Sequence, residues 1–216
     1  MSPRKPPHFA GADPWFEQHG YVRKGRFPSW VKDLTDDLQI VIEASASFYG
    51  EHNPKTSLEP WIRLPKLAKL DQSFYAGTPI VPRGNHAAMV LAPVERSIFD
   101  TEEIPLELSG CGPDWDSAIE QLEPGLNQIE SYLLDKRGDL RNVLDGPYFK
   151  LWHYPYAELL IILDAGDYEG AQQWLDAADY EKLINPRGRP TRPDEPTPAQ
   201  QHEHVRAVVS DFVRNR

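Results

Sequence analysis

The clearest pattern of apolar and polar positions runs from Leu38 to Phe48, where apolar residues occupy every second place. Alternate side chains of a β-strand point to opposite faces, so this period of two predicts a half-buried antiparallel strand. A helix is the alternative, because Ala and Glu in this segment favour helices. Two further apolar runs predict strands at Ala88 to Ala92 and at Ile104 to Leu108, the latter at a sheet edge or strand start because of Pro105. Together the three strands predict a small antiparallel sheet.

The segments around these strands are less regular. Trp30 to Asp37 is ambiguous, because no period persists long enough to assign an element. Gly50 to Arg83 is broken by five prolines, which lack the amide hydrogen that regular elements need. We therefore expect at most one short helix in that segment, at about Lys66 to Phe74.

From Asp114 the spacing of apolar residues changes to three and four. This spacing continues to Leu133 and predicts an amphipathic helix that Asp114 caps. The Pro124-Gly125 pair should kink or split the helix, because proline lacks the hydrogen bond to the preceding turn. A further turn is expected at Asp139 to Leu144.

Two helices, Tyr156 to Ala165 and Tyr168 to Ala178, are predicted to form a hairpin. Gly166 suits the left-handed position that ends a helix, and Asp167 can cap the next one. The run at 166–171 resembles the Gly-Asp-Tyr-Glu-x-Ala turn of tetratricopeptide-type hairpins. The resemblance covers one hairpin, without a second copy at that family's period of about 34 residues. It implies hairpin geometry and no function.

The last helix opens with Thr197-Pro198-Ala199-Gln200, which supplies a capping residue, a proline at the first helical position and the glutamine of a capping box. Its apolar stripe consists of Val205, Val208, Val209, Phe212 and Val213. Either the body of the protein or a partner must cover this stripe.

These patterns predict an α+β fold, with a small antiparallel sheet from the N-terminal half packed against C-terminal helices that include a hairpin. We expect a disordered lead-in at 1–14, a single α+β domain at 15–184, a Pro/Arg linker at 185–196 and a C-terminal helix at 197–216.

The 216-residue chain is 40% hydrophobic and 26% charged, which is ordinary for a globular protein. Its longest apolar run, Leu159 to Leu163, is much shorter than the roughly 20 residues that cross a bilayer. The first ten residues lack the apolar stretch of a secretion signal. Cys111 is the single cysteine, so an internal disulfide is impossible and a reducing compartment is favoured. We expect a cytoplasmic protein.

The net charge of −10 is unevenly distributed along the chain. Residues 99–181 carry 19 acidic and 4 basic side chains, whereas both flanking segments carry a small basic excess. A block this acidic repels phosphates, so it disfavours direct nucleic-acid or anionic-membrane binding and attracts a basic partner.

An aromatic segment lies inside the acidic block, with five aromatic residues among the nine from Tyr148 to Tyr156. Aromatic side chains of this density either fill a core or form a recognition surface. In the second case, carboxylates around aromatic anchors would suit a basic protein surface. The candidate partner-binding residues are Tyr148, Trp152, Tyr154, Tyr156, Asp164, Asp167 and Glu169.

Motifs of catalysis and metal binding are weak. The turn around Cys111 could bind an anion or activate its thiol, but it lacks the third glycine of a dinucleotide fingerprint and reads better as structural. His202 and His204 are two residues apart on a helix, which points them to different faces, and a solvent-exposed helix start explains them. The abundant carboxylate pairs are interpreted as a solvated face. We expect no cofactor, metal or catalytic residue.

The leading functional hypothesis is a non-enzymatic protein-binding module that docks a basic partner through residues 99–181. Its most concrete form is a bacterial immunity or inhibitor protein that occludes the cationic cleft of a nuclease-type toxin. One alternative is an enzyme whose site assembles from scattered residues such as Cys111, His86 and the carboxylates. Another is a scaffold or assembly protein that self-associates through the aromatic segment and the last helix.

Overall fold

The computed structural model describes residues 12–24, 29–47, 55–78, 81–82, 86–93, 107–109, 115–136, 140–146, 149–151, 154–184 and 192–216. They form an α+β structure, as the sequence predicts. The chain divides into two compact units: unit 1 is Met1–Ile62 with Leu91–Lys150, and unit 2 is Arg63–Val90 with Leu151–Arg216. This division cuts across the single domain expected at 15–184, and each unit is built from two separate stretches of chain.

The sheet has seven strands in the order β1-β2-β3-β4-β5-β7, with β6 paired to β4. The strands are β1 (Val22–Lys24), β2 (Ser29–Thr35), β3 (Leu38–Ser47), β4 (Lys55–Arg63), β5 (Met89–Pro93), β6 (Glu107–Ser109) and β7 (Phe149–Leu151). The pairs β1–β2, β2–β3 and β4–β6 are antiparallel. The sheet is therefore larger than the three strands that the sequence predicts.

The predicted strands correspond to β3, β5 and the overlapping β6. The expectation of no strand in the proline-rich segment is wrong, because β4 runs through Pro60. Pro60 is buried in a strand that lies between β3 and β5 in the sheet, a position where proline is rare. Since β1 and β7 have only three residues each, neither shows a period.

The core of unit 1 is organised around Trp30 of β2. Its ring stacks on Phe16 of α1 (Asp13–Gln18) with centroids 4.2 Å apart, and both side chains are fully buried. The Trp30 indole N–H donates to Asp13 at 2.9 Å, so the buried polar atom has a partner. Across the β2–β3 hairpin, Trp30 pairs with Ile42, and the Ile42 side chain is also buried.

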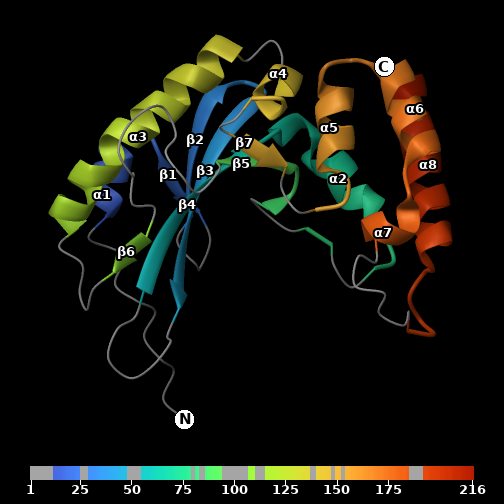
Figure 1. Cartoon of the computed structure of the whole chain (residues 1–216), viewed down its shortest axis with the longest axis horizontal. Helices are drawn as coiled ribbons and strands as arrows, with labels where there is room; N and C mark the ends of the chain where they lie inside the picture. The colour runs from blue at the N-terminus through green and yellow to red at the C-terminus, as the bar shows by residue number, and fades with distance from the viewer. Residues whose placement is uncertain are drawn as a thin grey trace. The chain divides into compact units, whose positions relative to one another are not determined.

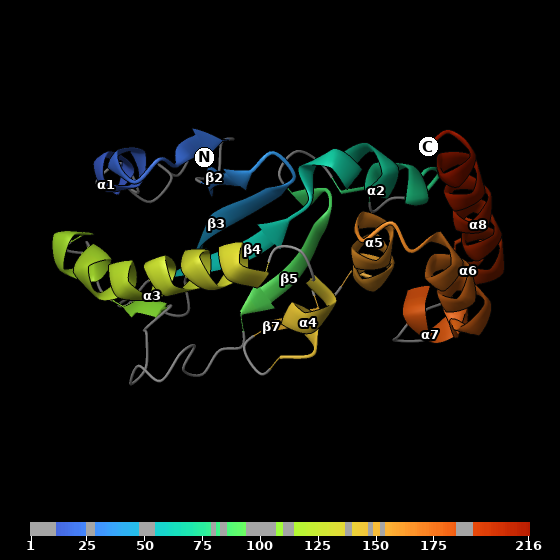
Figure 2. The ribbon, with the colours of Figure 1, turned by 90° about the horizontal axis from the view of Figure 1, so that it is seen from above.

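Helix α3 (Trp115–Lys136) runs along one face of the sheet in unit 1, as Figure 1 and Figure 2 show. Pro124 lies inside one continuous helix, so of the kink or split expected at Pro124-Gly125 the split does not occur. Glu130 of α3 accepts a hydrogen bond from the Tyr21 hydroxyl at 2.6 Å and pairs with Lys32 at 2.5 Å. These two contacts attach α3 to the sheet. The short α4 (Leu140–Leu144) follows, as predicted.

Unit 2 contains five helices among the described residues, preceded by the 3-10 turn η2 (Pro65–Leu67). The helices are α2 (Ala68–Phe74), α5 (Ala157–Asp164), α6 (Tyr168–Ala177), α7 (Tyr180–Ile184) and α8 (Pro198–Arg214). The predicted hairpin is confirmed as α5 and α6. Gly166 adopts φ 72° at the turn, a conformation that suits glycine, and the Asp167 carboxylate caps α6.

Helix α8 packs against α2, α6 and α7 within unit 2. Its Thr197 and Gln200 form the predicted capping box, and Val205 and Val209 are buried. The protein's own helices therefore cover the stripe only in part, because Val208, Phe212 and Val213 are half-buried. None of the helices in the described part of the chain is both long and apolar enough for a membrane crossing.

Candidate functional site

The aromatic residues singled out by the sequence do not share one environment. Tyr148 and Trp152 lie outside the described residues, as does Cys111. Tyr154 is half-buried, whereas Tyr156 is only 1% exposed. His86 is exposed at the start of the turn that precedes β5. The exposed aromatic surface considered from the sequence therefore does not include Tyr156.

Tyr156 belongs to the aromatic core of unit 2. Its ring lies 5.3 Å from Phe74, 5.6 Å from Tyr75 and 6.5 Å from Trp174, each in an edge-to-face arrangement. Burial raises the pKa of the Tyr156 hydroxyl, which stays protonated at neutral pH. The ring supports α2, α5 and α6 from inside and is not accessible to a partner.

The three candidate carboxylates lie at the turn between α5 and α6. Asp164 and Glu169 are exposed, while Asp167 is half-buried. The Asp167 carboxylate accepts the amide hydrogen of Gly170 at 2.8 Å. Asp167 therefore has a structural task as the cap of α6, and Asp164 and Glu169 are the more accessible charges of this turn.

Two further carboxylates, one on α6 and one just after it, form ion pairs with basic side chains. Asp176 binds Arg206 of α8 at 2.6 Å, and Asp179 binds Lys182 of α7 at 2.8 Å. Hydrogen bonds from these cations hold the pKa of each carboxyl below its usual value, so both are ionised at neutral pH. The basic C-terminal segment thus offsets part of the negative charge of α6.

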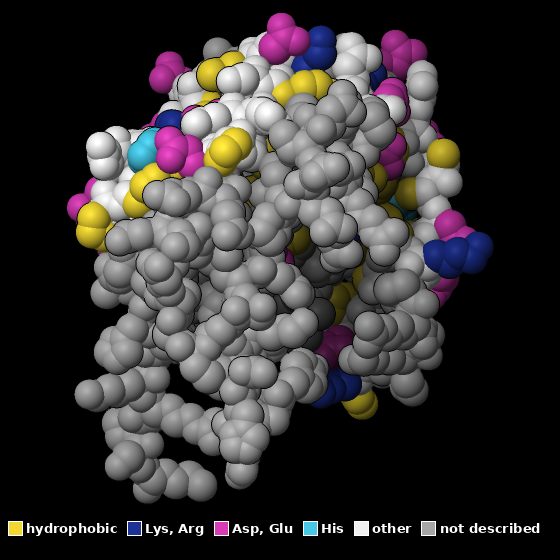
Figure 3. Space-filling model, turned by 60° about the vertical axis from the view of Figure 1, so that its left-hand side comes forward, with side chains coloured by type: hydrophobic (Ala, Val, Ile, Leu, Met, Phe, Trp, Pro, Cys, Tyr) yellow, Lys and Arg dark blue, Asp and Glu magenta, His cyan; other side chains and the backbone are white. Residues whose placement is uncertain are grey.

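The acidic block is divided between the two units. Its residues up to Lys150 belong to unit 1, and the remainder, 151–181, belongs to unit 2 and carries seven acidic and no basic side chains. On the face drawn in Figure 3, the described acidic side chains are scattered among apolar and basic ones. Within unit 2, the acidic part of the block is therefore the α5–α6 hairpin and the start of α7. Residues 99–135 of unit 1 are likewise of one sign, with ten acidic and no basic side chains.

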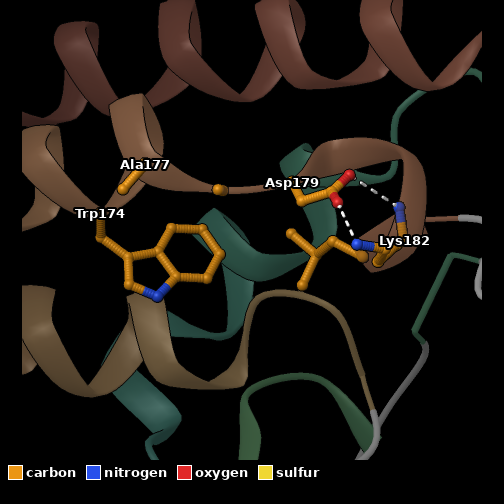
Figure 4. Close-up of a pocket in the computed structure, with 6 residues that line it drawn as sticks. Trp174, Ala177, Asp179 and Lys182 are labelled. Carbon is orange, nitrogen blue, oxygen red and sulfur yellow. Dashed lines mark hydrogen bonds and ion pairs between the residues drawn. The ribbon is translucent and has the colours of Figure 1, made fainter.

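A shallow pocket of about 390 Å³ opens beside this hairpin (Figure 4). The lining residues are Trp174, Ala177, Ala178, Asp179, Lys182 and Leu183. Trp174 lies on one side, and the Asp179–Lys182 ion pair lies on the other. The pocket thus combines an aromatic wall with an ionic rim, which is a common composition for a recognition site.

Two contacts, with Glu158 and Tyr156, hold the Trp174 side chain in place. Its indole N–H donates to the Glu158 carboxylate at 2.8 Å, and its ring contacts the buried Tyr156. A side chain fixed in this way loses little rotamer freedom on binding. The sequence analysis did not single out Trp174, although the predicted hairpin already places Glu158 and Trp174 on helices that pair.

A second candidate is the buried carboxyl of Asp71, which is 4% exposed. Burial raises its pKa to about 6, while the Ala88 amide and the nearby Arg63 lower the pKa in part. Asp71 accepts the Ala88 amide hydrogen at 2.7 Å, where Ala88 adopts φ 59°. Arg63 donates to the adjacent Ala87 carbonyl at 2.8 Å. These contacts hold the corner before β5, which gives Asp71 a structural role.

The prediction that His202 and His204 mark a solvent-exposed helix start is wrong. His202 is 3% exposed, with Nε2 3.0 Å from the Leu175 carbonyl, and its ring stacks on Tyr180. His204 Nε2 lies 2.8 Å from the Ser73 carbonyl. Both histidines therefore attach α8 to the other helices of unit 2.

Among the residues that the structure describes, no group of three or more His, Cys, Asp or Glu could hold a metal ion.

Comparison with known proteins found no matching family model, no matching curated protein and no matching solved structure.

Proposed function

We propose that this protein is a non-enzymatic binding module that docks a basic protein partner on the α5–α6–α7 surface of unit 2. The observation that carries the proposal is the charge of residues 151–181, with seven carboxylates and no lysine or arginine, beside a pocket with a fixed tryptophan. Carboxylates around an aromatic anchor favour a cationic protein surface and increase the rate of its association.

The most concrete form of this function is a bacterial immunity or inhibitor protein that acts in the cytoplasm. Nuclease-type toxins need cationic clefts to bind phosphates, and an acidic protein surface can occupy such a cleft in their place. The exposed carboxylates at the hairpin turn, Asp164 and Glu169, would then enter the cleft first.

The test takes as candidate partner any basic protein that a neighbouring gene encodes, and it measures both inhibition of nucleic-acid cleavage and the association rate. A triple variant, Asp164→Lys, Glu169→Lys and Glu181→Lys, reverses exposed charges while the Asp167 cap is kept. We expect association to slow by about tenfold to a hundredfold at low salt, because steering depends on the local field. The difference should shrink as salt is added.

A matched control reverses three exposed carboxylates of unit 1, with the variant Glu17→Lys, Asp36→Lys and Asp145→Lys. Both triple variants change the net charge equally, so the control separates a local docking surface from a general charge effect. Equal slowing by both variants would reject the α5–α6–α7 surface. Unchanged association of the first variant would reject electrostatic docking there.

A further inference from the structure

The geometry points to a more specific role for the pocket in Figure 4: it receives an arginine side chain of the partner, stacked on Trp174 and paired with Asp179. This inference rests on the proposed function for its partner class. The pocket itself can be tested with a small probe that does not require the partner.

The pocket offers both surfaces that a guanidinium group requires. The indole is a flat aromatic wall held by Glu158 and Tyr156, and cations are attracted to the faces of such rings. Ala177, Ala178 and Leu183 supply apolar contacts for the methylene groups of an arginine stem. The Asp179 carboxylate at the rim accepts the Lys182 amide hydrogen through Oδ1 at 3.3 Å and pairs with Lys182 Nζ through Oδ2. Its remaining lone pairs can accept hydrogen bonds from a guanidinium.

The cation that Asp179 binds in this structure is easily exchanged. Lys182 is three residues further along the chain, and its side chain is 86% exposed. Ion pairs this exposed contribute little to stability, so an incoming cation loses little by replacing Lys182. Lys182 therefore competes with an incoming guanidinium for Asp179. Removing the Lys182 charge should consequently strengthen binding of an arginine side chain.

Around the pocket, carboxylates outnumber cations. Asp179 pairs with Lys182, and Asp176 pairs with Arg206, which also donates to the Leu175 carbonyl. Glu158, which holds Trp174, and Glu181, next to Lys182 in the sequence, are two further carboxylates. The surplus of negative charge favours a cationic guest over an anionic one. Arginine is favoured over lysine, because its planar group can stack on an indole and bind a carboxylate in a bidentate manner.

The probe is acetyl-arginine methylamide, titrated into the ¹⁵N-labelled full chain at low salt, with the uncharged citrulline analogue as the matched control. The readout is the indole Nε1–H signal of Trp174, assigned from its loss in Trp174→Phe. The Trp30 indole signal in unit 1 serves as an internal reference, because Trp30 is buried and bonded to Asp13. We expect a saturable shift of the Trp174 signal with the arginine probe only.

Two exposed-site variants then test the ionic rim in opposite directions. Asp179→Asn should weaken binding of the arginine probe by about twofold to fivefold, because it removes the acceptor charge. Lys182→Gln should strengthen binding by a similar factor, because it removes the competitor. Similar shifts with both probes, no saturable shift, or weaker binding in Lys182→Gln would each overturn the inference.

The outcomes also separate this inference from the proposed function. A probe-specific shift of the Trp174 signal, combined with partner association that the reversals at Asp164, Glu169 and Glu181 leave unchanged, would support the arginine pocket and reject the proposed function. A partner that responds to the charge reversals at Asp164, Glu169 and Glu181, together with an unresponsive Trp174 signal, would support the function and remove the arginine pocket.

Discussion

At the scale of single residues, Asp71 shows how unit 2 uses a buried charge. The carboxyl lies among Tyr75, Arg63 and the main chain at Ala88, and burial is the main reason why its pKa rises to about 6. A carboxyl whose folded pKa lies above its unfolded value favours the folded protein when it is protonated. This contribution is present below about pH 4 and is lost as the pH rises through about 6.

Asp71→Asn should therefore remove the part of the pH dependence of the unfolding free energy that comes from ionisation of Asp71. Relative to the wild type, the variant should gain about 3 kcal/mol of unfolding free energy between pH 4 and pH 7, because asparagine does not ionise but can still accept the Ala88 amide hydrogen. Urea unfolding at both pH values measures this. The exposed Asp36→Asn serves as the control, with parallel curves expected. Parallel curves for Asp71→Asn as well would disprove the ionisation cost.

The sequence could not indicate these residue-scale features. Asp71 meets Ala88 only because α2 and the corner before β5 come together, and its neighbours Arg63, Tyr75 and Ala88 come from three places in the chain. Trp174 depends on Glu158 in the same way. The carboxylates of the α5–α6 turn were predictable, because a short turn between two helices exposes its polar residues whatever lies elsewhere.

At the scale of elements, the long amphipathic helix, the hairpin and the capped last helix follow from local spacing and capping residues, and all were predictable. The strand β4 was not, because Pro60 violates the rule by which central strands are recognised. Helix α7 was hidden because it has only five residues and no buried one. The histidines of α8 appeared exposed because their contacts come from other parts of the chain: His202 contacts Leu175 of α6 and Tyr180 of α7, and His204 contacts Ser73 of α2.

Glu130 of α3 accepts hydrogen bonds from two side chains, Tyr21 and Lys32 of β2. Glu130→Ala should lower the unfolding free energy by about 2 to 4 kcal/mol, because it leaves the buried Tyr21 hydroxyl and the Lys32 ammonium without their acceptor. Glu123→Ala, on the same helix but 41% exposed and paired with His19, should cost less than about 1 kcal/mol. Equal losses of unfolding free energy in the two variants, measured by chemical denaturation, would contradict this prediction.

The start of α6 provides a second element-scale prediction. A Cβ on Gly170 would collide with the capping carboxylate of Asp167, so Gly170→Ala should bring little or no gain in the wild type. In an Asp167→Ala background the collision is absent, and the same change should stabilise by about 1 kcal/mol, the usual advantage of alanine in a helix. Thermal unfolding of the four proteins of this cycle measures the coupling. Additive effects would show that the cap and the glycine are independent.

At the scale of the whole molecule, charge and chain path are both divided between the units. Unit 1 carries 21 acidic and 12 basic residues, and unit 2 carries 12 and 11. The acidic character of the hairpin therefore exists within a nearly neutral unit. The sequence revealed the acidic block but not this division, because the chain enters unit 2 at Arg63 and returns to it at Leu151.

The divided chain path predicts complementation between fragments. Residues 151–216 alone should remain largely unfolded, because α8 lacks the α2 carbonyls of Ser73 and Phe74 and the apolar surface of α2. Adding a peptide of residues 63–90 should increase helicity, as measured by circular dichroism. A Phe74→Asp version of the peptide is the control and should fail, because Phe74 is fully buried. A stable helical fold of 151–216 by itself would contradict the prediction.

The interleaved path also sets an order of events during synthesis. All residues of unit 1 have been made once Lys150 is added, whereas α2, made earlier, acquires its partner α8 only when Arg214 follows. Arg214 follows the end of α2 by 140 residues, so at typical translation rates the nascent chain presents the uncovered side of α2 for about 7 to 28 s. Chaperones that recognise apolar segments at the ribosome should therefore engage this helix before the protein is complete.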